Sequence, residues 1–149
     1  MSQYDDLIGA GGRAILERLY PHLETPDCPM TADAVDDYLN TGQVVAVPMT
    51  FADRFSITAS WRSIHPQHLI NLVQSMGRNH HVVVRGTRPR GSPYTHNHFF
   101  VLANIGGRVY VVDAMTREVT SDVGEYIRRQ GFNRLDYTRS FEAAEQPVY

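Results

Sequence analysis

The sequence lacks several features that would assign it to a particular class of protein. A single cysteine among 149 residues excludes an internal disulfide, so the fold does not depend on an oxidising compartment. No apolar run reaches the length of a membrane span. Residues 1–6 also lack the basic and then apolar pattern of a signal peptide. A net charge of -2 gives no electrostatic case for nucleic acid. We therefore expect neither a nucleic-acid partner nor a membrane partner.

The overall composition is that of an ordinary globular protein. Hydrophobic residues make up 42% of the chain and charged residues 20%, which excludes wholesale disorder. A chain of this length fits one domain around one hydrophobic core. We expect a single domain over residues 1–149, acting in a reducing cytosol or forming part of a longer exported polypeptide.

Helices dominate the predicted N-terminal part. Apolar spacing predicts an amphipathic helix over residues 13–23, which Pro21 ends early. A second helix is expected to begin at Cys28, because Pro29 suits a first helical position, and to end at Gly42. Its predicted buried stripe is Ala32, Val35 and Leu39, and its predicted exposed face is Asp33, Asp36 and Asp37.

The remaining pattern predicts a mostly antiparallel sheet. Helices are expected from near Pro66 to Gly77 and from Ser121 or Asp122 to Gln130. Strands are expected at residues 82–84 and 132–137, in a short stretch at 43–48, and in a hairpin over 95–113. N-terminal helices packed on a mostly antiparallel sheet make an α+β domain.

The hairpin carries the first candidate site. His98 opens its first strand, Asp113 closes its second, and a glycine turn joins the two. Folding of the hairpin brings both residues to the same end of the sheet. A carboxylate beside a histidine orients the ring and stabilises its charged form, as in a catalytic triad.

Cys28 is the candidate nucleophile. At a helix N-terminus, free N–H groups and the positive end of the dipole favour a thiolate. Such a thiolate needs a base that forms it and a group that orients the base. We therefore predict a triad of Cys28, His98 and Asp113. His96, which faces the same side of an extended strand, is the alternative base, and we favour His98 because the apolar strand fixes it by packing.

The same residues permit a metal site as an alternative. A His-x-His pair on a strand, His96 and His98, could bind a metal with Asp113 as a third ligand. A metal site would leave the position of Cys28 unexplained. We therefore predict that the protein uses no metal and no other cofactor.

These motifs resemble the papain-like fold of bacterial toxin and effector domains. The resemblance covers residues 25–115 and is carried by Cys28 at a helix start and by the hairpin HFFVLANIGGRVYVVDA. It implies Cys28 as nucleophile, His98 as general base and acid, and Asp113 as orienting carboxylate. The chain departs from this group in having Ala114 and Met115 where deamidase relatives commonly carry a glutamine. This departure favours a cysteine protease over the alternative, a glutamine deamidase.

The resemblance also implies a biological setting. Domains of this group are commonly the C-terminal toxic parts of longer secreted proteins, exported by a specialised secretion system and active in the cytoplasm of a target cell. We therefore expect a target-cell protein as substrate and a cognate immunity protein as inhibitor.

The backbone N–H of Cys28 is the one oxyanion donor that we predict.

Overall fold

The computed structural model describes residues 2–21, 28–46, 55–58, 60–92, 97–139 and 142–145. Its helices are α1 (Gln3–Ile8), α2 (Gly12–Leu19), α3 (Cys28–Thr41), α4 (Pro66–Met76) and α5 (Val123–Gln130). Its strands are β1 (Phe55–Thr58), β2 (Arg62–Ser63), β3 (His80–Thr87), β4 (Asn97–Ile105), β5 (Arg108–Asp113), β6 (Glu118–Thr120), β7 (Arg134–Thr138) and β8 (Glu142–Glu145). No helix in this part of the chain is both long and apolar enough to cross a bilayer.

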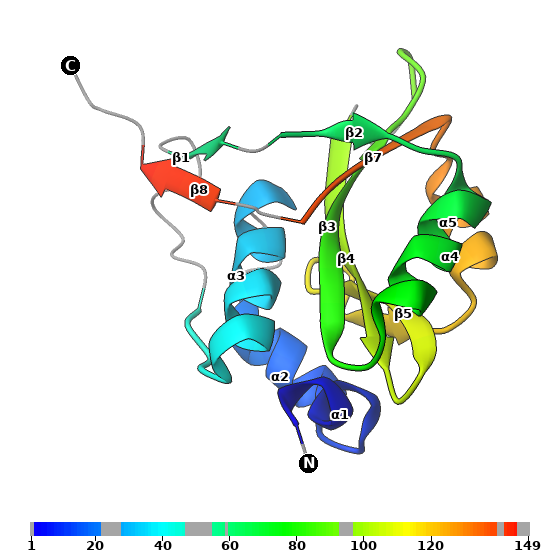
Figure 1. Cartoon of the computed structure of the whole chain (residues 1–149). Helices are drawn as coiled ribbons and strands as arrows, with labels where there is room; N and C mark the ends of the chain where they lie inside the picture. Colours follow the sequence, from blue (N-terminus) through cyan, green and yellow to red (C-terminus); the bar gives the residue numbers. More distant parts are fainter. Residues whose placement is uncertain are drawn as a thin grey trace.

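The main sheet is antiparallel throughout. Its six strands lie in the order β2-β7-β3-β4-β5-β6, and β1 pairs separately with β8. Helices α1, α2 and α3 lie on one side of this sheet, and α4 and α5 lie on the other (Figure 1). The predicted α+β class is therefore confirmed, with the sheet as the middle of three layers.

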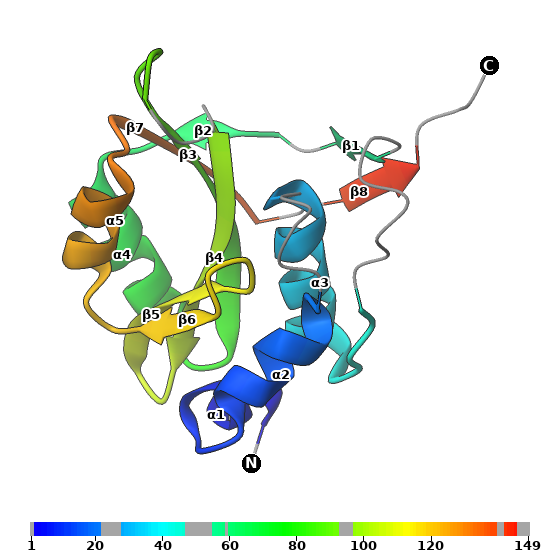
Figure 2. The ribbon, with the colours of Figure 1, turned by 180° about the vertical axis from the view of Figure 1, so that it is seen from behind.

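The central strand β4 separates two hydrophobic cores. Val101, Ala103 and Ile105 pack with α1, α2 and α3 in one core, whereas Phe100 and Leu102 pack with α4 and α5 in the other. Successive strand residues point to opposite faces of a sheet, so this strand supplies both cores in turn. The view from behind shows the same division of the helices about the sheet (Figure 2).

The turn of the β4–β5 hairpin depends on two glycines. Gly106 and Gly107 both have a positive φ, of 63° and 92°. A two-residue hairpin turn of this type requires positive φ at both central positions, which glycine adopts without steric cost. The predicted hairpin is confirmed, and its turn fixes the register that pairs Val101 with Val112 near the far end.

Most predicted elements are present, with adjusted ends. The helix expected over residues 13–23 is α2, which stops at Leu19. The helix expected from Pro66 ends at its Gly77 cap, and the helix expected from Ser121 or Asp122 is α5, which begins at Val123 with Asp122 as its N-cap. Residues 43–46 form no strand, and the rest of the short strand expected at 43–48 lies outside the described residues.

Candidate active site

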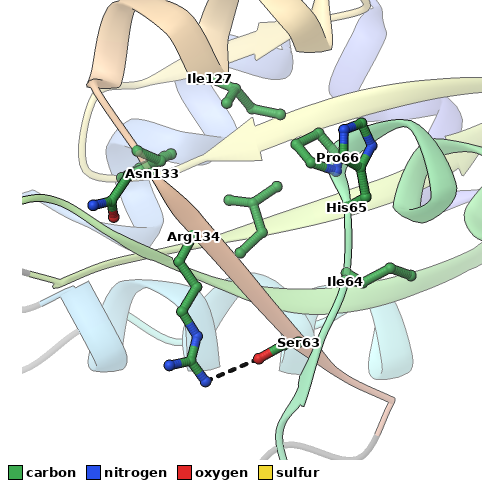
Figure 3. Close-up of a pocket in the computed structure, with 9 residues that line it drawn as sticks. Ser63, Ile64, His65, Pro66, Ile127, Asn133 and Arg134 are labelled. Atoms are coloured by element: carbon green, nitrogen blue, oxygen red, sulfur yellow. Dashed lines mark hydrogen bonds between the residues drawn. The ribbon is translucent and has the colours of Figure 1, made fainter.

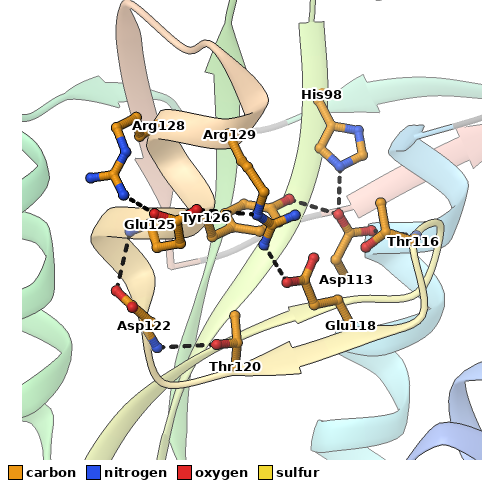
Figure 4. A network of polar contacts seen from close by, with 10 residues as sticks. All are labelled: His98, Asp113, Thr116, Glu118, Thr120, Asp122, Glu125, Tyr126, Arg128 and Arg129. Atoms are coloured by element: carbon orange, nitrogen blue, oxygen red, sulfur yellow. Dashed lines mark hydrogen bonds and ion pairs between the residues drawn. The ribbon is translucent and has the colours of Figure 1, made fainter.

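His98 and Asp113 form a buried pair at one end of the sheet. His98 is the second residue of β4 and Asp113 is the last of β5. The Nε2 atom of His98 lies 2.7 Å from Oδ2 of Asp113. Only 3% of His98 and 1% of Asp113 is exposed to solvent. The predicted proximity of the two side chains is confirmed, and Figure 4 shows them with their neighbours.

Four hydrogen-bond donors surround the carboxylate of Asp113. Oδ2 accepts from His98 and from the hydroxyl of Tyr126, which lies 2.6 Å away. Oδ1 accepts from the backbone N–H groups of Met115 and Thr116, at 3.0 Å and 3.2 Å. Burial opposes ionisation, but the contacts with His98, Tyr126 and Thr116 together lower the pKa of Asp113 below its ordinary value. Asp113 is therefore held as a carboxylate.

An ionised Asp113 determines the tautomer of neutral His98. A carboxylate accepts hydrogen bonds but donates none, so the proton on the neutral ring must be on Nε2. The lone pair of the ring is then on Nδ1, the nitrogen that Figure 4 shows pointing away from Asp113. Nδ1 is the atom that could accept a proton from a nucleophile.

Aromatic rings hold His98 in place. Its ring stacks on Phe100 and Phe132, with centroids 6.3 Å and 6.1 Å apart. Gly86 pairs with His98 across β3 and β4, and a Cβ atom there would lie 2.6 Å from ring atoms of Phe132. The absence of a side chain at Gly86 therefore makes the space that Phe132 occupies. The guanidinium of Arg88 lies over the Phe132 ring, 4.9 Å from its centroid.

Tyr126 is a site residue that the sequence reading did not identify. It is fully buried on α5 and reaches across the layer to Asp113. Burial and then the charge of Asp113 raise the pKa of its phenol well above the ordinary value. Tyr126 therefore stays neutral and donates its proton to the carboxylate. The one signal in the sequence is its place on the apolar side of α5, beside Val123, which equally suits an ordinary core residue.

Helix α3 places the backbone of Cys28 at the same end of the sheet as His98. Further along, Asp36 of α3 bonds to His81, which pairs with Ala103 of β4. Cys28 begins α3 about 12 Å before Asp36 along the helix. His98 lies about 17 Å before Ala103 along the strand. In both ribbon views, α3 and β4 run in the same direction, and both begin toward the same end of the sheet (Figures 1 and 2).

The His98 ring and helix α3, which begins at Cys28, lie on opposite faces of the sheet. The His98 ring lies with Phe100 and Phe132 on the side of α5, whereas α3 covers the opposite face of β4. In the described part of the chain, β4 pairs with β5 only from Val101 onward. The first residues of β4 therefore extend beyond the part of the strand that pairs with β5.

Of the predicted triad, the structure shows His98 and Asp113 in contact. The Cys28 side chain and the whole of His96 lie outside what it describes.

A second buried histidine–carboxylate pair corrects one sequence-based expectation. Asp36, expected on an exposed helix face, is buried, and it lies 2.6 Å from Nε2 of His81. Nδ1 of His81 lies 2.6 Å from the hydroxyl of Tyr4. Both ring nitrogens are therefore engaged in tying α1, α3 and β3 together. The prediction that Asp36 is exposed was wrong, because His81 is a buried hydrogen-bond partner that helical periodicity alone does not reveal.

A metal site would need ligands gathered in one place. Among the described residues, Asp33, Asp36 and Asp37 are the only group of three or more candidate ligands, with ligand atoms within 4.8 Å of one another. Asp36 is already engaged by His81. The alternative set of His96, His98 and Asp113 includes a residue outside the described part, and its Asp113 oxygens already accept from four donors.

Comparison of the chain with protein-family models, with curated proteins and with solved structures found no match.

Proposed function

We propose that this chain is a thiol hydrolase of papain-like fold, with Cys28 as nucleophile, His98 as base and Asp113 as orienting carboxylate. The observation that supports it is the His98–Asp113 pair, in which a buried carboxylate leaves the basic lone pair of the ring on Nδ1. The start of α3, with its positive dipole end, lies at the same end of the sheet and favours a thiolate at Cys28.

The reaction would proceed through an acyl-enzyme. Nδ1 of His98 takes the thiol proton, and Asp113 stabilises the imidazolium that results. The Cys28 thiolate adds to an amide carbonyl, whose oxygen is stabilised by the backbone N–H of Cys28. His98 then gives its proton to the leaving nitrogen as the carbon–nitrogen bond breaks. Water, deprotonated by His98, hydrolyses the thioester and restores the thiol.

The surroundings of Asp113 support this reading over a metal site. Its two oxygens accept four hydrogen bonds, two of them from backbone N–H groups that cannot move away without opening the turn after β5. A metal bound by Asp113 would have to displace at least one of these donors and would leave it buried without a partner. The four hydrogen bonds therefore account for the buried charge of Asp113 without a metal ion.

The proposal extends to the substrate and the inhibitor. We propose that the substrate is a protein in a target cell, and that a cognate immunity protein blocks the enzyme in the producing cell. Cleavage of a main-chain amide and deamidation of a glutamine side chain follow the same steps and differ only in the leaving nitrogen. Cleavage is favoured on the sequence departure at Ala114 and Met115.

The products of the reaction test the proposal. Recipient cells would express wild-type protein, Cys28→Ala or His98→Ala, and their proteins would be compared by mass spectrometry. New protein termini in the wild-type cells alone would show a protease. An intact protein about one dalton heavier, also in the wild-type cells alone, would show the deamidase. The same products in all three would contradict the assigned roles, and chelation would then test the metal alternative.

A further inference from the structure

A second charged cluster lies on the face of the sheet that α3 covers. At its centre is Asp136 of β7, which is buried. Oδ1 of Asp136 accepts from the hydroxyl of Ser63 at 2.6 Å and from two guanidinium nitrogens of Arg134 at 3.1 Å and 3.2 Å. Arg85 of β3 approaches Oδ2 at 3.4 Å. Arg134 and Ser63 also line a cavity of about 480 Å³ at the outer edge of β7 (Figure 3).

Among the residues that the structure describes, the cluster holds two guanidinium groups and one carboxylate, so positive charge is in excess. Burial opposes ionisation of Asp136, but Ser63, Arg134 and Arg85 lower its pKa below the ordinary value, so it carries one negative charge. Two guanidinium groups share that single charge. Arg134 makes the shorter, double contact, and Arg85 makes one long contact. The charge in excess is therefore mainly that of Arg85.

The guanidinium of Arg85 is held in one orientation. It lies over the ring of Trp61, 4.6 Å from the centroid, and its Nη2 atom lies 3.4 Å from Oδ2 of Asp136. Trp61 in turn packs edge-on against Phe99, with centroids 5.8 Å apart. The Arg85 side chain is 27% exposed. A planar guanidinium fixed in this way keeps N–H groups available for an incoming acceptor.

Arg85 lies at the level of the start of α3. It pairs across the ladder with Phe99, and the side chains of both residues point to the face that α3 covers. Phe99 is next to His98 in β4, at the end of the sheet where α3 begins. The excess positive charge therefore lies on the face that α3 covers, toward the end of the sheet where the backbone of α3 begins.

We propose that Arg85 is a specificity-determining residue that binds a carboxylate of the substrate, so that the enzyme prefers an acidic side chain near the amide it attacks. One guanidinium in excess matches one carboxylate in charge and in bidentate geometry. The proposal rests on the proposed function, because it takes Cys28 as the reacting group.

Two alkylating agents that differ in charge test the role of Arg85. Iodoacetate carries a carboxylate and iodoacetamide does not, and Cys28 is the single cysteine that either can modify. In the wild type, the ratio of the iodoacetate rate to the iodoacetamide rate should exceed that of a free cysteine peptide about fivefold, through the nearby positive charge. Arg85→Gln should lower the ratio severalfold toward that of the peptide, because the remaining positive charge near Cys28 is that of the α3 N-terminus and His98.

Arg62→Gln is the matched control. Arg62 is also an arginine at this edge of the sheet, but it pairs with Tyr137 and so points to the face opposite Ser63 and Asp136. Its replacement removes the same charge and should leave the ratio unchanged. Equal ratios in wild type and Arg85→Gln, or an equal fall in both variants, would overturn the proposal.

A measurement without any variant covers the case in which Arg85→Gln does not fold. N-acetylglutamate should protect wild-type Cys28 from iodoacetamide more than N-acetylglutamine does, and equal protection would overturn the proposal. If the proposed function itself is wrong, a different measurement shows it. Wild-type Cys28 would then react with iodoacetamide no faster than a free thiol, whatever the ratio between the two reagents.

Discussion

Replacement of Asp113 by asparagine should strongly destabilise the fold. All four groups around the carboxylate are donors in the observed arrangement: His98, Tyr126 and the backbone N–H groups of Met115 and Thr116. Asparagine has one oxygen and one NH₂ group. In either orientation, its NH₂ group faces two of these donors, so two charge-assisted hydrogen bonds are lost, and His98 could bond to the NH₂ group only by moving its proton from Nε2 to Nδ1. Each bond to a charged acceptor contributes about 1.5–3 kcal/mol, so Asp113→Asn should cost about 3–6 kcal/mol.

The cost should depend on pH in one direction. The pKa of Asp113 is lowered in the folded protein relative to its ordinary value of 3.8. The stabilisation from its charge is therefore fully present above that ordinary value and is lost as the pH falls through the lower folded value. The difference in unfolding free energy between wild type and Asp113→Asn should shrink on acidification. Urea unfolding at pH 7 and at several pH values below 4 measures it.

Asp122→Asn is the control for this experiment. Asp122 is an exposed carboxylate that caps α5, and asparagine caps a helix about as well. Its replacement should change the unfolding free energy by no more than about 0.5 kcal/mol. A cost below about 1 kcal/mol for Asp113→Asn, or one as large for Asp122→Asn, would refute the reasoning about the buried carboxylate.

Three further changes test neighbouring contacts. Tyr126→Phe removes one donor to Asp113 and should cost about 1.5–3 kcal/mol by urea unfolding. Gly86→Ala should cost about 1–3 kcal/mol by crowding Phe132, and the cost should largely vanish in the Phe132→Ala background of a double-mutant cycle. Tyr4→Phe should cost about 1–2 kcal/mol at neutral pH. Burial raises the pKa of Tyr4 from 10.0 to about 12, so the stabilisation is fully present below pH 10 and is lost as the pH rises from there through about 12. The difference between wild type and Tyr4→Phe should narrow accordingly, and a constant difference would contradict the assignment.

The sequence predicted the hairpin at the centre of the site because its signals are local. Strand spacing and two adjacent glycines determine which residues meet at its open end, and His98 and Asp113 do meet there. The helix beginning at Cys28 follows in the same way from Pro29 and the apolar stripe. Each of these predictions depends on residues close together in the chain.

The contacts that could not be predicted join residues far apart in the chain. Tyr126 reaches Asp113 only because α5 packs against β5, and Asp36 is buried only because His81 lies under α3. The near-continuous apolar run of β4 did contain a missed signal. A strand with one wet face alternates between apolar and polar residues, whereas this strand is buried on both faces. That pattern would have predicted helices on the second face.

The central claim is that His98 and Cys28 share a proton, and a thiolate titration tests it most directly. Thiolate absorbance near 240 nm reports Cys28 alone, since the chain has no other cysteine. The pKa of Cys28 should lie well below the ordinary value of about 8.5 in the wild type and close to it in His98→Ala. His81→Ala, which removes the other buried histidine–carboxylate pair, should keep the low pKa. A Cys28 that titrates near its ordinary pKa in the wild type, or identically in wild type and His98→Ala, would contradict the claim.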